Sequence, residues 1–79
     1  MIGVRVKLTF PESLVREPVV ARMIREFDIL VNLRRADIGE HSGWIICELD
    51  GTGETIDRVV AWLASEGVEV DLLGDIVES

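Results

Sequence analysis

The sequence predicts an α+β fold in which one antiparallel sheet carries two helices on a single face. Apolar and polar residues alternate in four short segments, as in half-buried strands, and apolar residues recur at helical spacing in two others. These elements follow one another in the order β-α-β-β-α-β. Two right-handed β-α-β connections joined by a hairpin give the ferredoxin-like sandwich, with an expected strand order of 4-1-3-2 and the second strand at an edge.

The beginning of the chain supplies a strand and a helix. Residues 1–10, MIGVRVKLTF, alternate apolar with polar side chains, and Pro11 ends the strand. Pro18 suits the first turn of a helix, because that position needs no backbone N–H. Residues 12–17 are expected to form a loop, with or without a turn of helix. The predicted apolar stripe of the first helix consists of Val20, Met23, Ile24 and Phe27.

The middle of the chain predicts a β-hairpin. Residues 29–36 form the second strand, and a polar, glycine-containing stretch from Gly39 to Gly43 forms the turn. The third strand runs from about Trp44 to Leu49 and returns antiparallel to the second.

The second helix and the last strand complete the order. Thr52 or Gly53 can cap the helix, and Gly67 is a suitable stop. The last strand covers residues 68–73, and residues 74–79 are expected to be a tail. The predicted apolar stripe of this helix consists of Ile56, Val59, Val60, Leu63 and Ala64.

Alternation assigns each strand residue to one of two faces of the sheet. The face toward the helices should carry Val4, Val6, Leu8, Ile29, Val31, Leu33, Ile45, Cys47, Leu49, Val68, Val70 and Leu72. The opposite, open face should carry Arg5, Lys7, Thr9, Leu30, Asn32, Arg34, Trp44, Ile46, Glu48, Glu69, Asp71 and Leu73.

Two features of the predicted open face stand out. Arg5 and Lys7 lie between acidic residues of the neighbouring strands, which predicts a cross-strand charge ladder or simply a solvated face. Leu30, Trp44 and Ile46 would form an apolar strip. A contiguous strip of this kind suggests an interface or a ligand site, although a small one can be tolerated in water.

Composition limits the classes of function. The chain has 79 residues, 48% of them hydrophobic, which indicates one globular domain over residues 1–79 that gains stability by pairing. A net charge of −7 argues against binding to nucleic acid or to an anionic membrane surface. No apolar run approaches the roughly 20 residues that span a bilayer. The single cysteine, Cys47, fits a reducing cytoplasm.

The residues that most often carry catalysis do not form a convincing site. His41 is the only histidine and falls in the predicted turn, where a histidine is usually solvated. Cys47 points to the core in the predicted register, so nucleophilic catalysis by a Cys–His pair is not expected. One cysteine cannot build a thiolate zinc or iron–sulfur centre. We therefore expect neither an enzyme, nor a metal site, nor a cofactor.

Several segments of the chain occur together in a known family. They are VNLRRADI at residues 31–38, Gly43 followed by an apolar strand, Asp50-Gly51, and the ending Val-x-Val-x-x-Leu-Gly at residues 68–74. Together they resemble the NIL domain, which is named for an Asn-Ile-Leu strand. Its best-known members are ferredoxin-like regulatory modules on the ATPase subunits of bacterial methionine importers. Those modules pair and bind methionine to restrain transport, and others occur alone or beside ferredoxin-type iron–sulfur modules.

This resemblance implies a regulatory domain that binds an amino acid, methionine by resemblance, between paired copies and signals to a partner protein. Asn32 matches the family's asparagine, whereas Leu33 and Arg34 depart from the Ile and Leu of the family name. The Asn32 amide can bind a ligand or a paired copy, or it can simply bond water. The alternative function is a ligand-free dimerisation module on an iron–sulfur or transporter protein. The expected ligand-binding residues are Leu30, Asn32, Arg34, Trp44 and Ile46.

Overall fold

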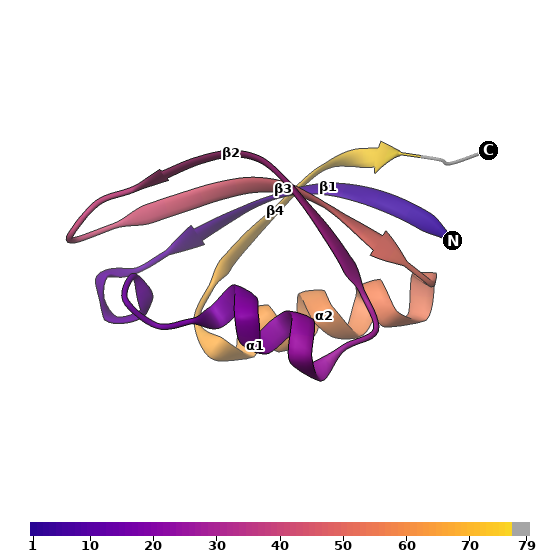
Figure 1. Cartoon of the computed structure of the whole chain (residues 1–79), viewed down its shortest axis with the longest axis horizontal. Coiled ribbons are helices and arrows are strands. Elements are labelled where there is room, and N and C mark those ends of the chain that lie inside the picture. The colour runs from indigo at the N-terminus through magenta and orange to yellow at the C-terminus, as the bar shows by residue number, and fades with distance from the viewer. Residues whose placement is uncertain (77–79) are drawn as a thin grey trace.

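The structure is a computed structural model that describes residues 1–76. Its four strands form one antiparallel sheet in the order β2-β3-β1-β4, and both helices lie on the same side of that sheet (Figure 1). The predicted ferredoxin-like fold and strand order are therefore confirmed. The elements are β1 (Ile2–Phe10), η1 (Glu12–Leu14), α1 (Val19–Glu26), β2 (Leu30–Ile38), β3 (Gly43–Gly51), α2 (Gly53–Glu66) and β4 (Glu69–Ile76).

The core fills the space between the sheet and the helix layer. The two central strands supply most of it, and their registered pairs Val6–Cys47 and Leu8–Ile45 are buried. The helices close it with Met23 from α1 and with the buried stripe of α2. The buried apolar residues are Val4, Val6, Leu8, Phe10, Val19, Met23, Ile29, Ile45, Cys47, Leu49, Ile56, Val59, Leu63 and Val68.

Three residues predicted for the core are largely exposed. Leu33 and Leu72 pair with the buried Cys47 and Val6, so they lie on the helix side as predicted, but they are 58% and 64% exposed. Both belong to edge strands, where the short helix layer gives less cover. Ile24 is 49% exposed because it lies on the solvent side of α1. Alternation therefore gave the correct face for the strand residues that were assigned to one, but it overestimated the burial of Leu33 and Leu72 on the edge strands.

A β-bulge interrupts the pairing of β2 with β3. Leu33 pairs with Cys47 and Arg35 pairs with Ile46, so Arg34 is an extra residue without a partner on β3. Beyond the bulge the helix-side apolar residues of β2 have even residue numbers, whereas before it they have odd ones. The strand continues to Ile38 and does not end at residue 36 as predicted. This phase change places Arg34 and Arg35 on the same, open face.

A second bulge lies on the opposite edge of the sheet. Val6 pairs with Leu72 and Arg5 pairs with Gly74, so Leu73 is the extra residue of β4. Gly74 adopts φ 148°, which a side chain would disfavour. The strand then continues to Ile76. The predicted tail at residues 74–79 is therefore wrong for residues 74–76, and residues 77–79 lie outside the described part of the chain.

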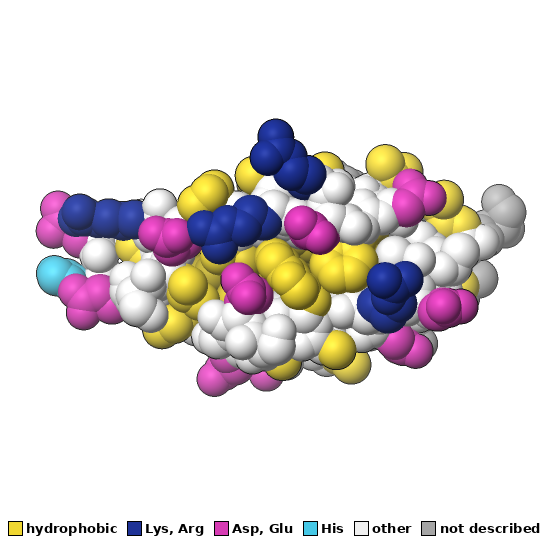
Figure 2. Space-filling model, turned by 90° about the horizontal axis from the view of Figure 1, so that it is seen from below, with side chains coloured by type: hydrophobic (Ala, Val, Ile, Leu, Met, Phe, Trp, Pro, Cys, Tyr) yellow, Lys and Arg dark blue, Asp and Glu magenta, His cyan; other side chains and the backbone are white. Residues whose placement is uncertain are grey.

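The ends of α2 follow the sequence signals. The Thr52 side chain accepts a hydrogen bond from the backbone N–H of Thr55 at 3.1 Å, so Thr52 is the N-cap. Gly67 ends the helix in the left-handed conformation, with φ 99°. Viewed from the helix side, hydrophobic side chains show between mixed charges (Figure 2). The rings of Phe27 and Trp62 pack edge to face with their centroids 5.8 Å apart, and Trp62 packs against the core.

Replacing a buried strand leucine should destabilise the fold far more than replacing an exposed one. Leu49 in β3 is 0% exposed, and Leu49→Ala should lower the free energy of unfolding by about 2–5 kcal/mol. Leu33→Ala makes the same truncation on the neighbouring strand and should cost less than about 1 kcal/mol. Urea unfolding monitored by circular dichroism measures both values. Equal losses would show that Leu33 belongs to the core after all.

Candidate functional site

The open face of the sheet carries a charged cluster centred on Glu48. One carboxylate oxygen accepts a hydrogen bond from the Arg5 guanidinium at 2.9 Å, and the other accepts a longer one from the Asn32 amide at 3.4 Å. Arg5 on β1 and Asn32 on β2 lie on either side of Glu48, because each is paired with Glu48 in the register of the sheet. The predicted charge ladder is thus formed between Arg5 and Glu48.

These neighbours keep Glu48 ionised. The hydrogen bond from Arg5 lowers the pKa of Glu48 below its ordinary value, and burial opposes this effect. The positive charges of Arg34 and Arg5 and the hydrogen bond from Asn32 lower the pKa further. The carboxylate is therefore a fixed negative charge that holds Arg5 and Asn32 in place.

Beside Glu48 the open face is hollowed. The hollow has a volume of about 340 Å³ and is lined by Arg5, Arg34, Arg35, Ile46 and Leu73. We call it the arginine hollow. The two bulges supply two of its walls, since the extra residue of β2 is Arg34 and the extra residue of β4 is Leu73. The hollow combines three guanidinium groups with the apolar side chains of Ile46 and Leu73, so it can take an anion that has an apolar part.

The structure brings together only part of the predicted ligand site. Arg34 and Ile46 line the arginine hollow, and Asn32 lies next to it through Glu48. Leu30 is 64% exposed and pairs with Asp50, with the Asn32–Glu48 pair between it and the hollow. The predicted contiguous strip of Leu30, Ile46 and Trp44 is therefore wrong, because Leu30 lies too far along β2.

Trp44 lies toward the hairpin, outside the lining of the hollow. It pairs with Thr9 on β1 and Asp37 on β2. The Lys7 ammonium stands 5.2 Å from the centroid of its ring, a cation–π distance. Lys7 also pairs with Asp71 in the register, as the predicted ladder requires. Trp44 therefore packs under Lys7 instead of forming a wall for a ligand in the hollow.

Sequence reasoning missed Arg35 and Leu73 as site residues. For Arg35 a signal was present: the apolar residues of β2 stand at odd positions up to Leu33 and at even positions from Ala36 onward. A strand can change phase in this way only by a bulge or a break, which would have placed both arginines on one face. Alternation placed Leu73 on the open face, but no sequence signal indicated the bulge in β4 that brings it to the hollow.

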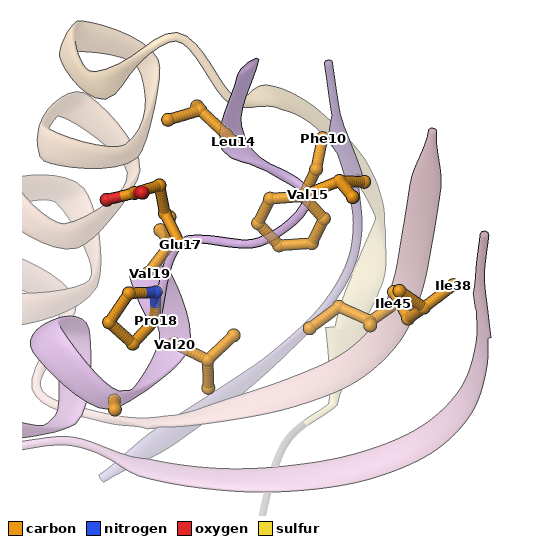
Figure 3. Close-up of a pocket in the computed structure, with 10 residues that line it drawn as sticks. Phe10, Leu14, Val15, Glu17, Pro18, Val19, Val20, Ile38 and Ile45 are labelled. Carbon is orange, nitrogen blue, oxygen red and sulfur yellow. The ribbon is translucent and has the colours of Figure 1, made fainter. Parts of the chain in front are cut away.

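A second hollow lies on the helix side, where the end of β1, η1 and the start of α1 meet the end of β2 and the start of β3 (Figure 3). Its volume is about 190 Å³. Its single acidic side chain, Glu17, is bonded to Arg22 at 2.7 Å. Polar groups that could orient a small ligand are thus scarce there, and the arginine hollow is the better candidate site. The apolar lining includes Phe10, Leu14, Val19, Val20, Ile38 and Ile45.

The remaining reactive residues are placed as predicted. Cys47 is fully buried, and burial together with the charge of Glu48 raises its pKa to about 11. His41 lies in the exposed hairpin turn, where its ring contacts the Glu12 carboxylate. The residues that the structure describes contain no group of three or more His, Cys, Asp and Glu side chains able to hold a metal ion. Neither of the helices described is long and apolar enough to cross a membrane.

Comparison with known proteins agrees with this architecture. The family model of the NIL domain matches residues 4–71. The chain belongs to the NIL domain family. The NIL match covers the four strands through Asp71 and both helices, and therefore includes every residue of the arginine hollow except Leu73.

Relatives of this NIL domain are parts of larger proteins. The chain is 32% identical over 76 residues to the methionine import ATP-binding protein MetN of Aliivibrio fischeri, covering 91% of the chain and 22% of that relative. It is 27% identical over 78 residues to the methionine import ATP-binding protein MetN 2 of Bacillus licheniformis, covering 94% and 23%. The chain thus spans less than a quarter of the length of these relatives.

The fold also matches a solved structure. The crystal structure of the C-terminal domain of an ABC transporter ATP-binding protein from Enterococcus faecalis superposes with a TM-score of 0.81 at 21% identity, covering 91% of this chain and 84% of that one. At this identity the likeness concerns the fold alone.

Removing Arg5 should raise the pKa of Glu48. A carboxyl whose pKa is lowered by folding stabilises the folded state above its unfolded pKa, and this contribution is lost as the pH falls through the folded-state pKa. In Arg5→Met the main cause of the lowered value is gone, so Glu48 should titrate closer to its ordinary value. Carbon-13 NMR of the side-chain carboxyl follows the titration. Arg22→Met, on the helix side, is the control, and equal Glu48 titrations in both variants would contradict the assignment.

Cys47 should be nearly inert toward thiol reagents in the folded protein. With a pKa of about 11, only about one thiol in a thousand is ionised at pH 8, and the side chain has no exposed surface. Reaction with Ellman's reagent should therefore be at least about 100-fold slower in buffer than in guanidinium chloride. Similar rates under the two conditions would show that the thiol is accessible.

Proposed function

We propose that this NIL domain is a regulatory module that binds an amino acid on the open face of its sheet, and that it is not an enzyme. The observation that carries this proposal is the arginine hollow beside the Asn32–Glu48 pair, where charged and amide groups surround the half-buried Ile46. The names of the relatives supply the ligand class, because they are methionine import ATP-binding proteins.

In this proposal Arg34 and Ile46 contact the ligand directly. Guanidinium groups bind carboxylates through paired hydrogen bonds, and Ile46 offers apolar contact to a side chain. Asn32 donates one amide N–H to Glu48, and its second N–H and its carbonyl oxygen can bond the ligand. Leu30 and Trp44, which lie to either side of the hollow along the sheet, would contact a paired copy rather than the ligand.

Regulation would follow from pairing. Two copies that meet through their open faces would enclose the ligand between them, and the ligand would favour the paired arrangement over the separate one. A partner protein on the cytoplasmic side would sense that change, and the names of the relatives point to the ATP-binding subunit of an importer as the class of partner. The ligand can shift the equilibrium only by its difference in affinity for the two arrangements.

Calorimetric titration of L-methionine, with other amino acids as a panel, tests the proposal. Saturable heat at one ligand per chain or per dimer is expected, and Asn32→Ala should weaken binding about tenfold or more by releasing Glu48. Thr9→Ala, on the same face but outside the hollow, should bind like the original chain. Absence of heat for every amino acid at millimolar concentration would refute amino-acid binding.

The second candidate function is a ligand-free interaction module on a transporter or iron–sulfur protein. The observation in its favour is the edge strand β2, where Leu30, Leu33 and Ile38 are 64%, 58% and 53% exposed. Sedimentation velocity separates the two functions. Dimerisation that Leu30→Ser abolishes, without any response to amino acids, would favour the interaction module.

A further inference from the structure

We propose that the arginine hollow binds the carboxylate of a small organic acid through Arg34 and Arg35, with the apolar part of the acid on Ile46 and Leu73, and that it requires no ammonium group on the ligand. This inference rests on the proposed ligand site of the open face and names the chemical class that the site accepts. It follows from which charges in the cluster are already neutralised.

Arg5 and Glu48 neutralise each other. Their side chains form an ion pair at 2.9 Å, and the second oxygen of Glu48 accepts from Asn32. An ammonium group on a ligand would have to compete with both of these donors for the carboxylate beside the hollow. Glu48 therefore holds the hollow together and adds little attraction for a ligand cation.

Arg34 and Arg35 differ from Arg5 because, within the described part of the chain, neither is bonded to a carboxylate, although the charge of Arg34 also acts on Glu48. Among the described residues neither guanidinium forms an ion pair or a side-chain hydrogen bond. The bulge nevertheless turns both of them to one hollow, where their like charges repel each other. A carboxylate relieves that repulsion and receives paired N–H donors from the planar guanidinium groups.

The rest of the hollow selects an acid with a short apolar body. Ile46 is half-buried, and Leu73 is 50% exposed, so both present apolar surface next to the guanidinium groups. A volume of about 340 Å³ suits a metabolite of amino-acid size and not a long chain. A net charge of −7 repels anions from the remainder of the protein, so attraction should depend on this local cationic site.

Three probes that differ at one functional group test the inference. L-Methionine carries both charges, its 2-oxo acid 4-methylthio-2-oxobutanoate keeps only the carboxylate, and L-methioninamide keeps only the ammonium. Each is titrated into the 79-residue chain at low salt by calorimetry or by following amide NMR shifts. The oxo acid should bind saturably, the amide should not bind, and binding should weaken as the salt concentration rises.

Charge-removing variants locate the site. Arg34→Gln and Arg35→Gln should each weaken oxo-acid binding about tenfold or more, and Arg34→Lys should restore part of it. Arg25→Gln changes the net charge equally from the exposed side of α1 and should leave binding unchanged. Circular dichroism melting of each variant shows whether it is folded.

The possible outcomes separate this inference from the proposed function. Oxo-acid binding that depends on Arg34 and Arg35, without methionine binding, supports the carboxylate site and refutes the amino-acid sensor. Methionine and methioninamide binding that does not depend on either arginine overturns the carboxylate site; it leaves amino-acid binding standing but without the proposed Arg34 contact. No binding of the oxo acid at millimolar concentration also overturns the carboxylate site.

Discussion

The open face depends on one constraint, namely that each edge strand carries one residue more than its neighbour can pair. In β2 the extra residue is Arg34, and in β4 it is Leu73. Strict alternation would have turned Arg35 toward the helix side of the sheet, away from Arg34. The bulge instead turns both arginines to the open face and returns Ala36 and Ile38 to the helix side. Both extra residues line the arginine hollow.

The same bulges affect how two copies can meet. An exposed edge strand tends to pair with the edge of another molecule, and bulges and charges oppose such pairing. An antiparallel pairing of β2 with itself centred on Arg34 would also place arginines opposite arginines, which is destabilising. Pairing through the open faces avoids this regular strand contact. An anion held between two such faces would also reduce the repulsion between the arginines of the two copies.

Sequence reasoning was accurate where a rule concerned one element and its immediate neighbours. The element order, the strand order, the Thr52 cap and the Gly67 stop needed only periodicity, capping preferences and connection handedness. It failed where the answer depended on the extent of another element. Leu33 and Leu72 point to the helix side, but their exposure depends on how far the helix layer reaches over the edge strands.

The site was predicted less completely than the fold, for a related reason. Alternation alone put Arg34 on the open face and left Arg35 out, although the apolar phase of β2 changes between Leu33 and Ala36. The prediction of a contiguous apolar strip was wrong because it considered only which face of the sheet each residue occupies. It did not consider how far apart those residues lie along the strands. Leu30 and Ile46 share a face, but the pairs that contain them lie four pairs apart in the register, with the Asn32–Glu48 pair between them.

Local and global charge act in opposite directions in this chain. The net charge of −7 keeps anions away from most of the surface, whereas the arginine hollow contributes three positive charges against the single negative charge of Glu48. Because Glu48 already holds Arg5 and Asn32, the excess positive charge resides on Arg34 and Arg35, the two residues that the bulge turned outward. The departure of Arg34 from the family's apolar residue thus adds a positive charge beside Asn32, Glu48 and Arg5, which hydrogen bonds already link to one another.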